Sequence, residues 1–390
     1  SSAAPTFAAD QADTLTAAIT GGDATVSLRY RAEYVDADDS SREAKASTLK
    51  TRITYKTLSY QGVSGVLEMD NNSVIGDKNY SESGADPAEE AVVADPSYTE
   101  INQAYIDYAA PADTLVRYGR QRILLDNQRF VGGVGWRQNE QTYDAARIDF
   151  TGVENLTATY AYINQVNDIF FNDTEVEDHL LNVGYKTSVG KVTGYTYLLK
   201  DKSDDFEDTN DTFGLRFKGK ASLDSLDILY TAEYAAQTFN DGTDGADDFD
   251  SAYSLLEAGV KVAGITFAAG METLGGDGDR AFETPLATKH AFNGWTDKFL
   301  GTNKATGKDG LVDTYAKAVT KVAGVKLLAV YHEYNTDNDS TFGGNEINLL
   351  AAKKFDKNFS AGIKLAKFNA ASKDSGTDAD KLWVWAEAKF

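Results

Sequence analysis

Apolar and polar residues alternate along most of this chain with a period of two. The stretch 24–36 is typical: one face carries Ser27, Arg29, Arg31 and Glu33, and the other carries Val26, Leu28, Tyr30, Ala32 and Tyr34. Successive side chains of a β-strand point to opposite sides, so this pattern predicts strands with one apolar and one polar face. Only the stretch 10–19 favours a helix instead, a short one before the first strand.

About eighteen segments show this alternation, and many have the length of a strand that crosses a bilayer, roughly ten residues. They are 23–36, 46–58, 61–71, 99–109, 113–122, 141–151, 154–165, 176–187, 190–201, 210–219, 225–238, 251–262, 264–273, 311–321, 324–335, 344–356, 359–370 and 378–390.

The connections between these segments alternate between short and long. Short ones include 109–113, 151–154, 188–190, 263–264, 323–324 and 356–358, and the hairpins 261–267 and 321–327 use nearly the same turn. Long ones are 37–45, 72–98, 123–140, 166–175, 201–209, 239–250, 274–310, 336–343 and 371–377. Short periplasmic turns and long extracellular loops are typical of antiparallel barrels in bacterial outer membranes.

The pattern therefore predicts an all-β fold: a transmembrane antiparallel β-barrel of about eighteen strands in the bacterial outer membrane. Residues 23–390 form the single barrel, and residues 1–22 precede it as a periplasmic segment. The alternative is a large soluble β-sandwich or propeller. In such folds short and long loops do not alternate strictly, and one face of each sheet is usually buried in an apolar core.

Composition agrees with strands and excludes membrane helices. The chain of 390 residues has 21 tyrosines, 19 phenylalanines, 33 glycines and only 5 prolines, and it lacks cysteine. Aromatic residues suit pleated sheets, whereas proline cannot donate to a sheet ladder. No stretch reaches the roughly 18 apolar residues that a membrane helix requires.

The last strand ends in an aromatic residue preceded by an apolar row. Counting back in twos from Phe390 gives Ala388, Ala386, Val384 and Leu382. This row resembles the insertion signal of outer-membrane proteins. The resemblance implies the barrel-assembly machinery, outer-membrane lipid and lipopolysaccharide as partners. Otherwise Phe390 simply caps an edge strand.

The polar face of the strands is rich in basic residues. The candidates for a pore-lining row are Arg29, Arg31, Lys50, Arg52, Lys56, Arg117, Arg147, Arg216 and Lys218, with only a few carboxylates, such as Glu33, Glu68, Asp107 and Asp149, beside them. A water-filled pore lined by arginine would concentrate small anionic solutes. Alternatively, these bases neutralise carboxylates in a structural ladder.

Acidic residues gather in the predicted extracellular loops, and the formal net charge is −22. The runs are 201–211, 241–250, the pair Asp337 and Asp339, and 374–380. They form a solvated surface, or divalent cations bridge them to each other or to lipopolysaccharide. None has the spacing of a calcium-binding loop, so neither a metal site nor a cofactor is predicted. The acidic chain is not expected to bind nucleic acid.

The third long connection differs from the acidic loops. It combines glycines with residues of mixed charge, which favours a loop that folds into the pore and narrows it; the alternative is an ordinary surface loop. Its candidate constriction residues are Arg122, Asp126, Arg129, Trp136, Arg137 and Glu140.

At this connection the sequence resembles the alginate-export family of outer-membrane barrels. The specific residues are Gly119–Ile123 (GRQRI) and Asp126–Asp144 (DNQRFVGGVGWRQNEQTYD), supported by Ser27–Tyr34 (SLRYRAEY) and the closing Trp383–Phe390. The likeness extends over most of the chain in strand layout. It implies an eighteen-stranded porin-like barrel with a positively charged lumen.

These observations favour passive diffusion of small hydrophilic solutes, with anions such as carboxylates or acidic saccharides preferred. Export of alginate or another anionic polysaccharide, or a plugged structural or adhesive barrel, remain alternatives, and homo-oligomerisation is left open. An enzyme is not expected. The three histidines, His179, His290 and His332, lie in separate segments, and the stretch 301–309 departs from a phosphate-binding loop in both spacing and final residue.

Overall fold

The computed structural model describes residues 10–82, 90–202, 208–242, 248–300, 307–372 and 376–390. Eighteen antiparallel strands form one sheet. They are β1 (Asp23–Ala37), β2 (Ala44–Lys56), β3 (Val63–Val74), β4 (Tyr98–Ala110), β5 (Thr114–Gln121), β6 (Thr142–Phe150), β7 (Leu156–Asn167), β8 (Asp173–Lys186), β9 (Gly190–Lys200), β10 (Thr209–Leu223), β11 (Leu226–Asn240), β12 (Phe249–Val262), β13 (Ile265–Leu274), β14 (Leu311–Val322), β15 (Val325–Asn335), β16 (Phe342–Lys354), β17 (Phe359–Ala370) and β18 (Ala379–Lys389).

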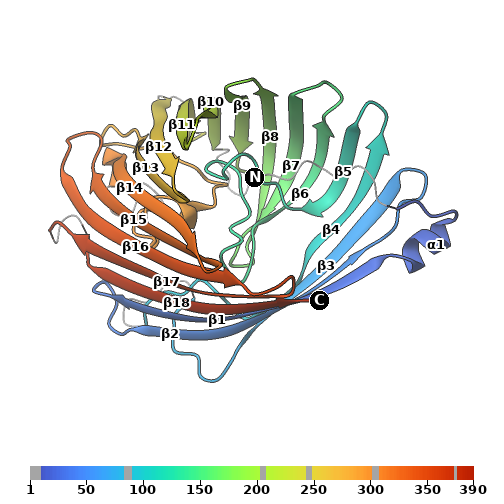
Figure 1. Ribbon diagram of the computed structural model, residues 1–390, viewed down its shortest axis with the longest axis horizontal. Helices are drawn as coiled ribbons and strands as arrows, with labels where there is room; N and C mark the ends of the chain where they lie inside the picture. Colours follow the sequence, from blue (N-terminus) through green and yellow to red (C-terminus); the bar gives the residue numbers. More distant parts are fainter. Residues whose placement is uncertain (1–9, 83–89, 203–207, 243–247, 301–306, 373–375) are drawn as a thin grey trace.

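Each strand pairs with its neighbours in the chain, and the last strand pairs with the first. β18 pairs with β1 in a register that sets Ala388 opposite Leu28, and Phe390 exchanges two backbone hydrogen bonds of 2.9 Å with Val26. The sheet is therefore a closed barrel, as Figure 1 shows where β17 and β18 meet β1 and β2. Closure removes the unpaired edges that an open sheet would expose.

All the strands predicted from the alternation are confirmed, with ends shifted by a few residues. β8 begins earlier than expected and β10 ends later, because the ladder of backbone hydrogen bonds continues into polar residues at the strand ends. Two turns carry the same backbone conformation, with φ of 49° and 81° at Ala263 and Gly264, and 50° and 82° at Ala323 and Gly324. Two-residue hairpins need positive φ at both central positions, which explains the repeated Ala-Gly.

The predicted helix at 10–19 is placed too early. The helix α1 spans Leu15–Thr20, because the Thr14 hydroxyl caps it by accepting a hydrogen bond of 3.1 Å from the Ala17 N–H. The Ala18 carbonyl accepts from the Leu58 N–H at 3.1 Å, so the segment lies against the turn between β2 and β3. No helix among the described residues is long and apolar enough to span a bilayer.

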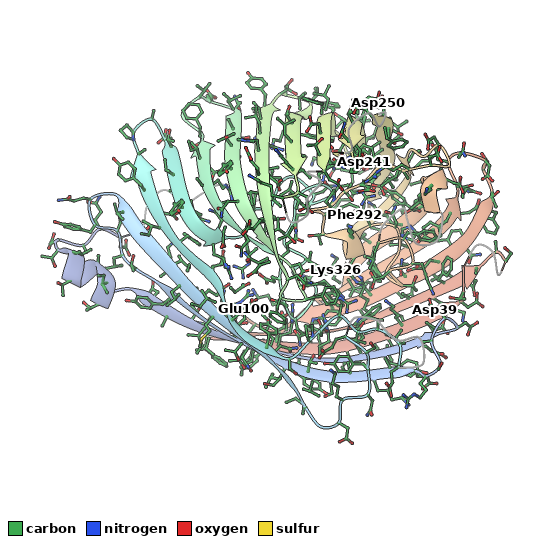
Figure 2. All side chains as sticks on the ribbon, turned by 180° about the vertical axis from the view of Figure 1, so that it is seen from behind. Asp39, Glu100, Asp241, Asp250, Phe292 and Lys326 are labelled. Carbon is green, nitrogen blue, oxygen red and sulfur yellow. The ribbon has the colours of Figure 1, made fainter. Side chains whose placement is uncertain are left out.

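Burial is inverted relative to a water-soluble protein. Outward-facing Tyr118, Leu256 and Leu215 are exposed, whereas inward-facing Asp70 and Glu346 are fully buried. The interior also holds apolar loop residues. Figure 2 shows Phe292 within the outline of the ring of strands, although it belongs to the long connection between β13 and β14. Lipid therefore covers the apolar face, and long connections fill much of the interior.

Candidate functional site

The predicted pore-lining cations lie on the inward face of the strands. Arg31, Lys50 and Arg216 are buried, while their sequence neighbours Tyr30 and Leu215 are exposed on the outer face. The remaining members of the set share the same parity on their strands: Arg29, Arg52, Lys56, Arg117, Arg147 and Lys218. All nine therefore lie on the inward side of the sheet.

Most of the inward arginines contact carboxylates on the same or the adjacent strand. The Arg117 guanidinium donates two hydrogen bonds to Asp107, of 2.7 and 2.8 Å. Arg147 donates to Asp149 at 2.8 Å, and Arg216 donates to Glu233. Such paired contacts are the strongest that arginine forms with a carboxylate. On these strands the arrangement is the charge ladder that the sequence left as an alternative.

A denser network joins β2 and β3 to the start of the third long connection. Arg52 donates to both oxygens of Asp70, at 2.7 and 2.6 Å, and lies 2.9 Å from Glu140. Lys50 lies 2.9 Å from Asp70, and Arg122 donates to Glu140. The inward face thus carries more carboxylates than expected, and Asp70 was missed although its parity matches that of Glu68.

The third long connection lies inside the barrel and contacts distant strands. Asp126 accepts a hydrogen bond of 2.7 Å from Asn182 on β8. Arg129 donates to Glu272 on β13 at 2.8 Å, and Arg137 lies 3.1 Å from Glu33 on β1. Contacts with β1, β8 and β13 require the loop to lie inside the barrel, because these strands are far apart in the sheet order.

Trp136 forms the centre of an aromatic cluster in this loop. Its ring is parallel to that of His290 with centroids 5.3 Å apart, and it meets Trp383 and Trp385 edge-on at 5.9 and 5.5 Å. Arg31 donates to the Trp136 carbonyl. The loop therefore packs against the wall formed by β18 and β1.

A second long connection, between β13 and β14, also folds inward, and sequence reasoning missed it. Its backbone N–H groups at Trp295 and Thr296 donate to Glu346 on β16, at 2.5 and 3.0 Å. The Leu286 carbonyl accepts from the Gly132 N–H at 2.8 Å. The signal was the stretch 291–300 (AFNGWTDKFL), which is rich in aromatic residues while most other long connections are acidic.

His290 lies at the junction of the two inward loops and the wall. Its Nδ1 is 2.5 Å from Asp297, and its Nε2 is 2.6 Å from the ammonium of Lys364 on β17. Asp297 also contacts Arg137 at 3.2 Å and Lys381 at 2.9 Å. A neutral imidazole with its proton on Nδ1 satisfies both contacts, since it donates to Asp297 and accepts from Lys364.

The loop residues at this junction have perturbed pKa values. Burial, with the nearby Lys364 ammonium, lowers the pKa of His290 to about 3. Burial favours the protonated form of Asp297, but His290, Lys381 and Arg137 hold its pKa well below the usual range. Likewise, Lys50, Arg122 and Arg52 overcome burial and hold the pKa of Glu140 well below its usual range. Both carboxylates are therefore ionised, and His290 is neutral, at neutral pH.

Lysines line the inner face of the barrel at its short-turn end on β2, β8 to β10, β12, β14 to β16 and β18. Each stands an even number of residues from a buried inward side chain of its strand, for example Lys56 from Lys50 and Lys326 from His332. We call this set the lysine collar: Lys56, Lys186, Lys191, Lys218, Lys220, Lys261, Lys321, Lys326, Lys354 and Lys389. Within the described part of the chain, only Lys191 and Lys220 of the collar have a carboxylate within ion-pair distance, at 3.9 and 3.3 Å.

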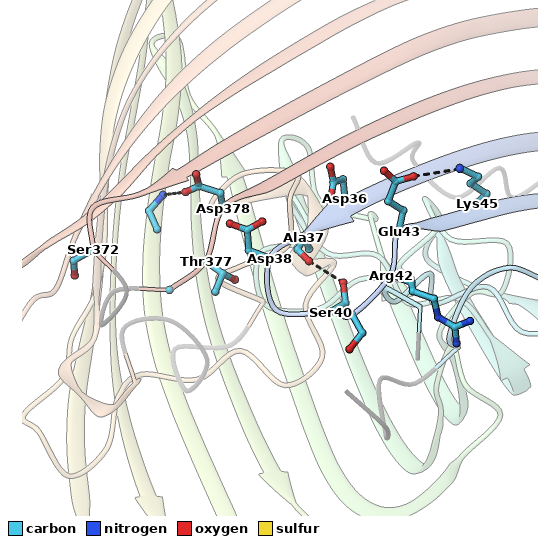
Figure 3. A pocket seen from close by; sticks show the side chains of 13 residues that line it. Asp36, Ala37, Asp38, Ser40, Arg42, Glu43, Lys45, Ser372, Thr377 and Asp378 are labelled. Atoms are coloured by element: carbon cyan, nitrogen blue, oxygen red, sulfur yellow. Dashed lines mark hydrogen bonds and ion pairs between the residues drawn. The ribbon is translucent and has the colours of Figure 1, made fainter. Parts of the chain in front are cut away.

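The long-loop end has the opposite charge. A hollow of about 1250 Å³ opens between the connections β1–β2 and β17–β18, and Figure 3 shows Asp36, Asp38, Glu43 and Asp378 around it. Glu43 pairs with Lys45 at 3.2 Å. Other predicted acidic runs belong to this end, but parts of them, at 203–207, 243–247 and 374–375, lie outside the described residues, as do residues 301–306 of the stretch compared with a phosphate loop.

The sequence profile of the alginate-export family matches residues 23–357, which is most of the barrel. The chain belongs to this family. No curated protein matches the chain.

Solved structures of outer-membrane proteins share the fold at low sequence identity. OccK9 (OpdG) of Pseudomonas aeruginosa superposes with a TM-score of 0.71 at 12% identity, covering 96% of this chain and 100% of its own. OpdK of the same species, solved with vanillate, gives 0.68 at 11% identity, covering 94% and 98%. OccAB4 of Acinetobacter baumannii gives 0.67 at 13% identity, also covering 94% and 98%.

Family membership and the closed barrel place the chain in the bacterial outer membrane, among porin-type barrels. The two inward loops and the lysine collar are the parts of the interior that a solute would meet.

Proposed function

We propose that the barrel is a diffusion channel that prefers small anions. The lysine collar is the observation that carries this proposal. Its ammonium groups line the inner face at the short-turn mouth, and most of them have no carboxylate within ion-pair distance among the described residues. Unbalanced charge of one sign at a mouth raises the local concentration of counter-ions and favours their entry.

The arginine row supports the proposal less than expected from the sequence. Arg117, Arg147 and Arg216 each form an ion pair with a carboxylate. The opposite charges of each pair largely cancel each other's electric field at a distance. Lys56 and Lys218 belong both to the predicted pore-lining set and to the collar, and no described carboxylate lies within ion-pair distance of either. Anion selectivity therefore rests mainly on the collar lysines at the short-turn ends of the strands. The arginines in the middle of the barrel contribute only secondarily.

The channel also fits solutes that carry a carboxylate on a small ring. The related fold of OpdK was solved with vanillate, which has this chemistry. In this chain the ammonium groups of the lysine collar would attract the carboxylate of such a solute. Among the described residues, no feature favours transport of a long polysaccharide over transport of such a small solute.

The test is the reversal potential of the refolded protein in planar bilayers under a salt gradient. We expect preference for chloride over potassium, and a marked loss of that preference in the triple variant Lys218→Gln, Lys261→Gln, Lys326→Gln. The matched control is Lys353→Gln with Lys357→Gln, which removes charge at the same end but from the outer strand face and a turn. Cation preference in the wild type, or an equal effect of the control, would overturn the proposal.

A further inference from the structure

All four tryptophans of the chain gather at one place inside the barrel. Trp383 and Trp385 lie on the inward face of β18, and Trp136 meets both rings. Trp295 comes from the second inward loop and shares the Lys364 ammonium with Trp136, at 3.9 and 4.2 Å. Outer-membrane barrels ordinarily place aromatic girdles on the lipid side. In this chain the four tryptophans lie inside the barrel instead.

Three buried N–H donors in this cluster have no partner among the described residues. They are the Nε of Arg31 and the Nε1 atoms of Trp136 and Trp383. Arg31 is 1% exposed and Trp383 is 0% exposed, so bulk water does not solvate these groups. An unsatisfied buried donor is costly, and such donors in native proteins normally have a bound partner.

The three donors belong to one contact cluster. The Arg31 guanidinium lies 5.1 Å from the centre of the Trp136 ring, and Trp383 meets Trp136 at 5.9 Å. On the paired strands β1 and β18, Arg31 is opposite Trp385 and Glu33 is opposite Trp383, so Arg31 and Trp383 are diagonal neighbours. Diagonal neighbours across a strand pair are within reach of long side chains.

Basic side chains and carboxylates surround the cluster. The cations in contact there are Arg31, Arg137, Lys364 and Lys381, and the carboxylates are Glu33, Asp95 and Asp297. All three unpartnered groups are N–H donors, and unpartnered donors favour an anion over a cation or an apolar group.

We propose that this cluster is a buried binding site for a small monovalent anion such as chloride. The N–H groups of Arg31, Trp136 and Trp383 hold it, and it fixes the constriction loop to the wall formed by β1 and β18. The site is independent of the lysine collar, which lies at the short-turn end. Selectivity of the channel and occupancy of this site are therefore separate properties.

Tryptophan fluorescence tests the proposal directly, because every tryptophan is in the cluster. Refolded barrel in detergent is titrated with sodium bromide against sodium gluconate at constant ionic strength. We expect saturable quenching in the wild type. Trp383→Phe removes one donor but keeps an aromatic ring, and should weaken bromide binding by at least about tenfold, since a hydrogen bond to a charged group is lost. Arg31→Lys should weaken it comparably.

The matched control is Trp385→Phe, which removes an indole of the same cluster but no orphaned donor. It should bind bromide like the wild type. Equal β-sheet circular dichroism shows that all three variants fold. A bromide anomalous peak between the three donors in crystals would support the site. Linear, non-saturating quenching, equal affinity of Trp383→Phe and Trp385→Phe, or only a water molecule at the three donors would overturn it, whatever the reversal potential of the channel.

Discussion

Arg137 and Asp297 join the two inward loops through an ion pair of 3.2 Å, although 160 residues separate them in the sequence. Asp297 also contacts Lys381 and His290, so one carboxylate links both loops to the wall. Removing one partner of a buried ion pair leaves the other charges uncompensated and costs about 3–5 kcal/mol. The position of both loops therefore depends on Asp297.

Asp297→Asn should release the loop between β13 and β14 from the interior. We expect trypsin to cut the folded barrel at Lys289 or Lys298 much faster than in the wild type, because the loop becomes accessible. The control is Asp279→Asn, an exposed residue of the same connection. Resistance of Asp297→Asn equal to that of the control would show that other contacts suffice to hold the loop.

Glu140→Gln should loosen the start of the constriction loop. Its carboxylate accepts from Arg122 and lies 2.9 Å from Arg52, and these cations keep its pKa well below the usual range. A lowered pKa means that the stabilisation is present above the unfolded pKa of about 4.3 and is lost only as pH falls through the lowered value. A loosened loop should add noise to the open-channel current. This added noise should be as large at pH 5 as at pH 7, because the wild-type Glu140 is ionised at both values.

His290 should remain neutral where ordinary histidines titrate. Its pKa of about 3 lies below the unfolded value of about 6.5, so the unfolded chain binds more protons between these values and stability falls as pH drops through this window. NMR of histidine-labelled barrel in detergent should show no change of the His290 ring signals between pH 7 and 5. Titration of His290 with a midpoint near pH 6.5 would contradict its burial and its contact with Lys364.

The opposed charges of the two mouths predict a rectifying current. The short-turn mouth carries the lysine collar, whereas acidic residues such as Asp36, Asp38 and Asp378 line the long-loop mouth. Charge asymmetry along a pore makes conductance depend on the sign of the voltage while the charges are unscreened. The Debye length is about 10 Å at 0.1 M salt and about 3 Å at 1 M. Current–voltage curves of oriented channels should be asymmetric at 0.1 M and nearly linear at 1 M, and asymmetry that persists at 1 M would point to loop motion instead.

Phe390→Ser should reduce assembly in cells without weakening the closed barrel. The Phe390 ring is exposed and contacts only Phe359 among described rings, at 5.7 Å, while its backbone pairs with Val26. We expect less protein in the outer membrane, but unchanged refolding in detergent. Lys389→Ser, one residue earlier on the inward face, is the control. If the Phe390→Ser variant reached normal levels in the outer membrane, Phe390 would not be an assembly signal and would only cap the last strand.

The sequence pattern alone determined the eighteen strands, their inward and outward rows of side chains, and the alternation of short and long loops. This succeeds because strand faces depend on local alternation, and lipid requires every outward row to be apolar. Only the tertiary structure decided that Asp70 and Glu140 neutralise Arg52 and that the loop carrying His290 folds inward. It also decided that most collar lysines have no such partner among the described residues, Lys191 and Lys220 being the exceptions. Those features depend on contacts between residues far apart in the chain, which a local pattern does not encode.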